Sequence, residues 1–130
     1  MDMIDKNLED FLPDKNTSYF KKFKSMKSAN RITEKQIIIE LQKVMDPEIP
    51  VNLYDLGLIY KIIIDSFNNI SVEMTLTNPN CPVAGSMPES VGNAIEKLPN
   101  LSSIKVSLVW YPKWNKDMMS EDAKLALDIF

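Results

Sequence analysis

The sequence contains no histidine and a single cysteine among its 130 residues. Without an imidazole, a Ser-His-Asp triad, a Cys-His dyad and a histidine-ligated metal are all excluded. Because Cys81 has no second cysteine to pair with, an intramolecular disulfide and a paired-cysteine zinc site are excluded as well. Any chemistry therefore has to come from Cys81, from carboxylates or hydroxyls, or from a partner, and we expect a reducing compartment.

Long apolar runs and an excess of positive charge are also missing. No window approaches the roughly 18 to 20 apolar residues that span a bilayer, and residues 1–14 lack the basic start and apolar run of a secretory signal. The net charge is -3, whereas nucleic acid and anionic lipid attract an excess of Lys and Arg. We therefore expect a cytoplasmic protein that binds neither nucleic acid nor membrane.

The composition that remains is that of an ordinary globular protein, with 45% hydrophobic and 25% charged residues. A chain of this length fits one compact domain with a short appendage. Residues 1–32 have an irregular pattern and are interpreted as an N-terminal arm, partly disordered or with a short helix, ahead of a domain over residues 33–130. The lysine-rich stretch from Lys21 to Arg31 is either a solvated tail or a docking site for an acidic partner.

Three segments show the apolar spacing of a helix. They cover about residues 34–45, 87–98 and 120–127. A hydroxyl side chain at the start of each segment predicts an N-cap. These residues are Thr33, Ser86 and Ser120. At the first helix Gln36 completes a capping box with Thr33, and a similar box is expected at Ser86.

Three further segments are typical of strands, at residues 58–65, 70–77 and 104–110. The second alternates apolar and polar side chains without a break, and residues 66–69 between the first two predict the tight turn of a hairpin. The predicted order is α-β-β-α-β-α. It implies an α/β (α+β) fold, a two-layer sandwich in which a three-stranded sheet carries helices packed on one face.

Cys81 is the first candidate for chemistry. It lies in a loop between a strand and the start of a helix, where free backbone N–H groups and the helix dipole favour a thiolate. A thiolate there would bind a metal or act as a nucleophile. The alternative is a cysteine buried as a small hydrophobic side chain.

Three carboxylates gather in the segment before the first strand. Asp46, Glu48 and Asp55 have the chemistry of hard metal ligands or of a general acid and base. Asp46 and Asp55 have an equally simple structural interpretation, because aspartates commonly cap loops and turns through their own backbone.

Two threonines precede the cysteine loop, and three aromatic rings lie near the C-terminal turn. Thr75 and Thr77 share one face of their strand and lead directly into the loop, so they are candidates for contact with a ligand held by the cysteine. Threonine is also a favoured strand residue. Trp110, Tyr111 and Trp114 predict an aromatic cover over the edge of the core or an interface with another protein.

Four segments in this order and spacing resemble the SufT/PaaD-like family of iron-sulfur cluster assembly proteins. They are Asp46-Pro47-Glu48-Ile49-Pro50-Val51-Asn52, Asp55-Leu56-Gly57-Leu58-Ile59-Tyr60, Met74-Thr75-Leu76-Thr77 with Cys81-Pro82, and Pro112-Lys113-Trp114. The resemblance covers roughly residues 33–128. It implies a small α/β protein of metal-sulfur cluster biosynthesis, a homodimer, a reactive cysteine at Cys81 and an acidic motif at Asp46 and Glu48. The PaaD branch carries an extra cysteine-rich part, so the SufT-like branch fits better.

The lone thiolate limits how a cluster is held. An iron-sulfur cluster usually takes four thiolate ligands, so we expect no tightly bound cluster and at most a transient one, with Cys81 as a labile ligand. The leading hypothesis is a non-enzymatic accessory factor that acts with the iron-sulfur assembly machinery and apo client proteins. The alternatives are an adaptor in which Cys81 is only structural, and a thiol enzyme with Cys81 as nucleophile.

Overall fold

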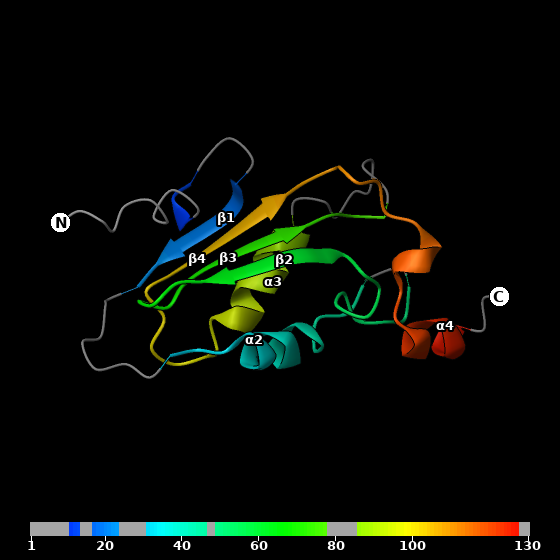
Figure 1. Cartoon of the computed structure of the whole chain (residues 1–130), viewed down its shortest axis with the longest axis horizontal. Helices are drawn as coiled ribbons and strands as arrows, with labels where there is room; N and C mark the ends of the chain where they lie inside the picture. Colours follow the sequence, from blue (N-terminus) through cyan, green and yellow to red (C-terminus); the bar gives the residue numbers. More distant parts are fainter. Residues whose placement is uncertain (1–10, 14–16, 24–30, 47–48, 78–85, 128–130) are drawn as a thin grey trace.

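The computed structural model describes residues 11–13, 17–23, 31–46, 49–77 and 86–127. Its elements are, in chain order, β1 (Thr17–Lys22), α2 (Glu34–Leu41), β2 (Ile59–Ile64), β3 (Asn69–Met74), α3 (Met87–Ile95), β4 (Ser103–Leu108), a 3₁₀ turn (Lys116–Met118) and α4 (Glu121–Leu127). The strands form one sheet in the order β1-β4-β3-β2 (Figure 1). β3 and β4 are parallel, and the outer pairs β1-β4 and β2-β3 are antiparallel.

The sheet has four strands, so the predicted three-stranded sheet and its element order are wrong. The additional strand, β1, comes from the segment interpreted as an N-terminal arm, and it pairs with β4 at one edge of the sheet. Its sequence has no clear strand pattern because an edge strand needs few inward apolar side chains and tolerates lysines. Tyr19 packs on Gly92 of α3, where an added Cβ would lie 2.1 Å from the tyrosine ring.

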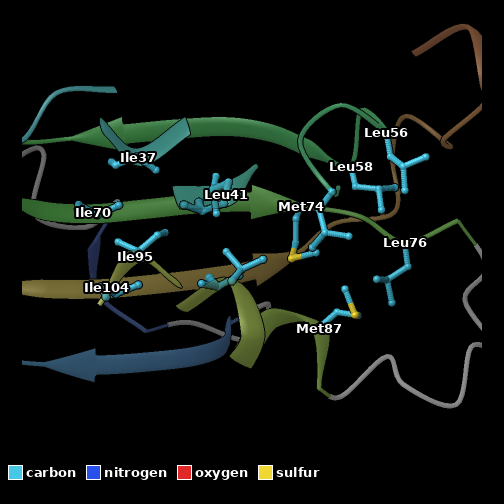
Figure 2. Close-up of a cluster of buried hydrophobic side chains, with 14 of the residues drawn as sticks. Ile37, Leu41, Leu56, Leu58, Ile70, Met74, Leu76, Met87, Ile95 and Ile104 are labelled. Atoms are coloured by element: carbon cyan, nitrogen blue, oxygen red, sulfur yellow. The ribbon is translucent and has the colours of Figure 1, made fainter. Parts of the chain in front are cut away.

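The helices α2 and α3 pack on one face of the sheet, as predicted. Apolar side chains of β3 and β4 alternate toward that face and form one cluster with the inward sides of both helices, as Figure 2 shows for Ile37, Leu41, Ile70, Ile95 and Ile104. All five are fully buried. Burying an isoleucine or leucine contributes roughly 1.5–3 kcal/mol, so this cluster is the main source of stability.

The helix boundaries follow the predicted caps at two of three places. Thr33 and Gln36 form the capping box before α2, and the Ser120 hydroxyl accepts from Ala123 N–H at 3.1 Å before α4. Ser86 makes no side-chain cap to α3, so that capping box is wrong. α2 ends at Leu41, earlier than expected, because the chain after it turns to hydrogen-bond with residues 51–53.

The predicted hairpin turn between β2 and β3 is confirmed. Asn68 takes the left-handed conformation, with φ at 63°. Asp65 Oδ1 accepts the backbone N–H groups of Phe67 and Asn69 at 2.9 and 2.8 Å. The buried Asn68 amide also accepts from Ile32 N–H at 2.9 Å, so the turn ties the residues before α2 to the sheet.

Candidate functional site

A small pocket lies where β3 and β4 end. Because the two strands are parallel, their carboxyl ends meet at one edge of the sheet, which is where sheets with parallel strands most often bind ligands. Val109 N–H donates to Met74 O at 2.8 Å there. Beyond this hydrogen bond the strands continue as irregular segments, and residues 75–77 and 110–114 enclose the pocket.

The pocket has a volume of about 290 Å³. It is lined by Thr75, Leu76, Thr77, Trp110, Tyr111, Lys113 and Trp114. Apolar and aromatic groups make up most of this lining, and Lys113 adds a positive charge. Because apolar walls lower the local dielectric constant, the ammonium group attracts an anionic guest more strongly here than in open water.

The aromatic segment is held in place by hydrogen bonds from side chains to backbone carbonyls. The Trp114 indole N–H donates to Leu56 O at 2.7 Å. The Tyr60 hydroxyl donates to Pro112 O at 2.7 Å. Partial burial raises the pKa of the Tyr60 phenol above its ordinary value. These bonds connect Trp114 and Pro112 to the motif around residues 55–60, so two of the sequence segments that carry the resemblance meet in space.

Gly57 is required for the close contact between the turn at residues 55–57 and the backbone of Met118. Its φ is +83°, which side-chain-bearing residues rarely adopt. A Cβ at this position would also lie 2.3 Å from the backbone oxygen of Met118. The Asp55-Leu56-Gly57 turn therefore packs against the segment around residues 118–120, which follows the pocket in the chain. Ser120 N–H donates to Asp55 O at 2.8 Å in the same contact.

Both predicted threonines line the pocket. Thr75 is 1% exposed, and its backbone N–H donates to Leu58 O at 2.8 Å. Among the described residues no hydrogen bond involves its hydroxyl. Because Thr75 lines the pocket, its hydroxyl is a candidate hydrogen-bond partner for a ligand. Thr77 is partly buried.

The described carboxylates of the segment before β2 have local partners. Asp46 Oδ1 accepts from Ile49 N–H at 2.8 Å. Asp55 Oδ2 accepts from the Asn52 side-chain amide at 2.9 Å, and Asp55 N–H donates to Asn52 Oδ1 at 2.8 Å. Neither aspartate lines the pocket. Within the described ranges no group of three or more acidic or cysteine side chains is arranged to hold a metal ion. The local hydrogen bonds of Asp46 and Asp55 favour the capping interpretation for these two residues.

Two predicted residues lie outside the described residues, namely Cys81 and Glu48. The roles predicted for both stay predictions. All three predicted aromatic side chains, Trp110, Tyr111 and Trp114, line the pocket together with the threonines. Lys113 belongs to one of the sequence motifs, but the sequence did not predict that it lines the pocket. A lysine near two tryptophans has the same sequence pattern whether its side chain lines a pocket or is solvated.

The fold and the pocket together define a class of protein. It is a mixed α+β domain whose sheet carries two helices on one face and a small aromatic pocket at the ends of its parallel strands. Residues 34–108 match the model of the family described as iron-sulfur cluster assembly protein. The match covers more than half of the chain, and the chain belongs to this family. The resemblance inferred from the four motifs is confirmed.

Relatives and solved structures agree with that assignment. A protein of Porphyromonas gingivalis named Fe-S protein maturation auxiliary factor is 48% identical over 95 residues, 73% of this chain and 90% of the relative. The maturation auxiliary factor SufT of Staphylococcus aureus is 38% identical over 86 residues, 66% of this chain and 98% of the relative. A domain of unknown function from Bacillus anthracis superposes with a TM-score of 0.70 at 38% identity, covering 75% of this chain and 92% of that one.

The relatives named here are called auxiliary factors, a description that is consistent with a role outside catalysis. In the described part of the chain no helix has the length and apolarity needed to cross a bilayer.

Proposed function

We propose that this protein is an accessory factor in the maturation of iron-sulfur proteins and that it handles an iron-sulfur cluster as transient cargo. Family membership gives the general role. The single observation that supports cargo handling is the pocket at the end of β3, whose threonine-bearing wall leads along the chain toward Cys81. Cys81 follows Thr77 by four residues, a distance of roughly 14 Å at full extension.

The proposed roles of the residues follow from their chemistry. Cys81 supplies one thiolate to the cluster, and the remaining ligands come from a second copy of the chain, a client or small thiols, because four are usually needed. The Thr75 hydroxyl donates a hydrogen bond to a sulfur or thiolate at the pocket. Lys113 offsets part of the negative charge that a thiolate-ligated cluster carries. Asp46 caps the neighbouring loop by accepting from Ile49 N–H.

Weak, shared ligation suits transfer better than storage. A cluster with one ligand from this chain is released when a client offers more thiolates, so the protein would act without being consumed and without chemical catalysis. The proposal includes a homodimer, contact with the iron-sulfur assembly machinery and apo clients, and a reducing compartment, the cytoplasm, where a thiol stays free.

A second function, that of an adaptor without cargo, is favoured by the exposure of the aromatic segment. Tyr111 is 88% exposed and Trp110 is 42% exposed. Exposed tyrosine and tryptophan side chains are enriched at the centres of protein interfaces. In this version the segment 110–114 binds a client, and Cys81 contributes only packing.

Transfer of a cluster in vitro separates the two functions. A cluster-loaded donor is mixed under anaerobic conditions with an apo enzyme whose activity requires the cluster, and the rate of activation is followed with and without this protein. Cargo handling predicts that Cys81→Ser abolishes the acceleration and Tyr111→Ser reduces it only modestly. The adaptor predicts the reverse order.

A matched control tests whether replacing any exposed large side chain alters the rate of activation. Leu125 lies on α4 and is 69% exposed, and its replacement by Ser should leave the acceleration unchanged in either case. Far-ultraviolet circular dichroism of each variant checks folding. If the wild-type protein does not accelerate activation at all, the proposed function is wrong in both versions.

A further inference from the structure

A second pocket lies at the opposite end of the strands, beside the edge strand β1. It has a volume of about 570 Å³, which is within the range of pockets that bind ligands. It is lined by Phe11, Leu12, Pro13, Phe20, Lys22, Phe23, Phe67, Asn69, Ser102 and Ser103. We call it the phenylalanine groove. Six of these residues precede residue 34, so they lie outside the family match, and the groove is distinct from the candidate site.

Hydrogen bonds fix the backbone and side chains in the walls of the groove. The Ser102 hydroxyl donates to Phe67 O at 2.5 Å, and the Ser103 hydroxyl donates to Asn69 Oδ1 at 2.6 Å. The buried Lys105 donates to Leu12 O at 3.0 Å and fixes the short segment 11–13 against the sheet. A preformed groove binds a guest with less ordering cost than one that must be assembled.

Apolar side chains in this groove remain exposed although they lie close together. Phe67 is 68% exposed and Phe20 is 36% exposed, whereas Phe11 is buried. Single exposed apolar residues need no explanation, but an apolar groove with several rings is typical of an interaction site. The rings suit apolar side chains of a partner and give the groove no preference for a purely polar ligand.

The charge around the groove indicates what else the partner carries. Lys21 forms an ion pair with Glu96, but the neighbouring Lys22 has no carboxylate partner among the described residues and lines the groove. In the sequence, residues 15–33 contain six basic residues and no acidic one, which leaves nine basic and eighteen acidic residues, a net -9, in the rest of the chain. β1 lies within this basic stretch, and Figure 1 shows it at the edge of the sheet.

We propose that the phenylalanine groove docks an acidic peptide segment of a partner protein, with an apolar side chain of the segment among the rings and a carboxylate beside Lys22. A peptide is favoured over a nucleic acid or an anionic membrane because the remaining chain, at a net -9, repels an extended polyanion. The groove is also too apolar for a phosphate backbone. This surface would recruit a partner, while the pocket at the other end of the strands remains free.

A peptide library tests the proposal and does not require the natural partner. A phage-displayed library of random ten-residue peptides is selected on the full chain and, in parallel, on the double variant Lys22→Glu/Phe67→Ser. The proposal predicts that the wild-type protein enriches peptides that combine Asp or Glu with aromatic or aliphatic residues and that the double variant does not. No enrichment, enrichment without acidic residues, or equal enrichment on both proteins overturns it.

One enriched peptide is then synthesised with a fluorescent label for measurements of affinity. Lys22→Glu should weaken binding about three- to tenfold, and added salt should weaken binding to the wild type. Phe67→Ser should weaken it about tenfold. The matched controls Lys35→Glu, on the exposed side of α2, and Leu125→Ser should leave the affinity unchanged.

Two competitors decide between classes of partner. A single-stranded oligonucleotide and vesicles containing anionic lipid are each added to the labelled complex. The proposal predicts that neither displaces the peptide at concentrations well above that of the protein. If either binds more tightly than the peptide and depends on Lys22, the groove is a nucleic-acid or membrane site and the proposal is wrong.

Discussion

At the scale of single residues, Thr75 is the buried hydroxyl residue that lines the pocket. Its side chain is buried at the end of β3, and its hydroxyl has no hydrogen bond among the described residues. A hydroxyl in this position either reduces stability without benefit or meets a ligand when one is present. The fold alone gives no reason to prefer threonine to the isosteric valine here.

Thr75→Val therefore separates the two cases. Because no hydrogen bond is lost, we expect the free energy of unfolding to change by less than about 1 kcal/mol or to rise, while acceleration of cluster transfer falls. Urea unfolding and the transfer assay measure the two effects. Ser71→Ala is the control, since Ser71 is a buried hydroxyl residue of β3, the strand before Thr75, and lies outside the pocket. Unchanged transfer in Thr75→Val would show that the hydroxyl has no role with cargo.

The contribution of Tyr60 to the free energy of unfolding should depend on pH. Partial burial raises the pKa of its phenol from 10.0, and only the neutral phenol donates to Pro112 O. The unfolded chain ionises first, so the stabilising contribution is complete below 10.0 and is lost as the pH rises through the folded pKa. Urea unfolding at increasing alkaline pH should show a steeper loss of stability for the wild type than for Tyr60→Phe. Equal slopes would contradict this account.

At the scale of elements, β1 is attached to the domain through a close contact between Tyr19 and Gly92 of α3. A Gly92→Ala substitution has two opposing effects. It improves helix propensity by about 1 kcal/mol, and it forces the new methyl group into the tyrosine ring, which typically costs about 1–3 kcal/mol.

The sign of the effect should consequently depend on the tyrosine. In the wild-type background we expect Gly92→Ala to destabilise the protein, and in a Tyr19→Ala background to stabilise it by up to about 1 kcal/mol. A double-mutant cycle in urea measures the difference. If Gly92→Ala has the same effect with and without the ring, β1 does not pack on α3 in the way described.

Elements with a local pattern in the sequence could be predicted, and those defined by distant pairing could not. The helices and β2 to β4 were predicted because apolar side chains repeat at regular spacing and caps such as Thr33 lie next to them. β1 was missed because its partner strand lies some 80 residues away, its burial alternates only over its first residues and its lysines resemble a solvated tail. The parallel pairing of β3 with β4 likewise leaves no local pattern.

The candidate site was predictable to a similar degree. Thr75 and Thr77 were predicted to contact a ligand and the aromatic segment to cover the edge of the core, but nothing in the sequence indicated that the two segments line one pocket. The hydrogen bonds that bring the segments together, such as that from Trp114 to Leu56 O, use backbone oxygens. Any residue provides such an acceptor, so the partner of Trp114 could not be identified from the sequence.

At the scale of the whole molecule, two surfaces lie at opposite ends of the central strands. The pocket beside Thr75 is built within and next to the family match, and the phenylalanine groove is built largely from residues that precede it. The arrangement fits a protein that receives a cluster at one end and contacts a partner at the other. Loss of the groove should then reduce the rate of maturation in cells and leave transfer in vitro intact.

The central claim is that Cys81 serves the maturation of iron-sulfur proteins. Its most direct test is the activity of iron-sulfur enzymes in cells that lack this protein, complemented with the wild type or with Cys81→Ser at matched expression. We predict that the wild type restores the activity and the serine variant does not. Equal restoration by both would show that Cys81 is dispensable, and normal activity in the deletion strain would contradict the proposed function itself.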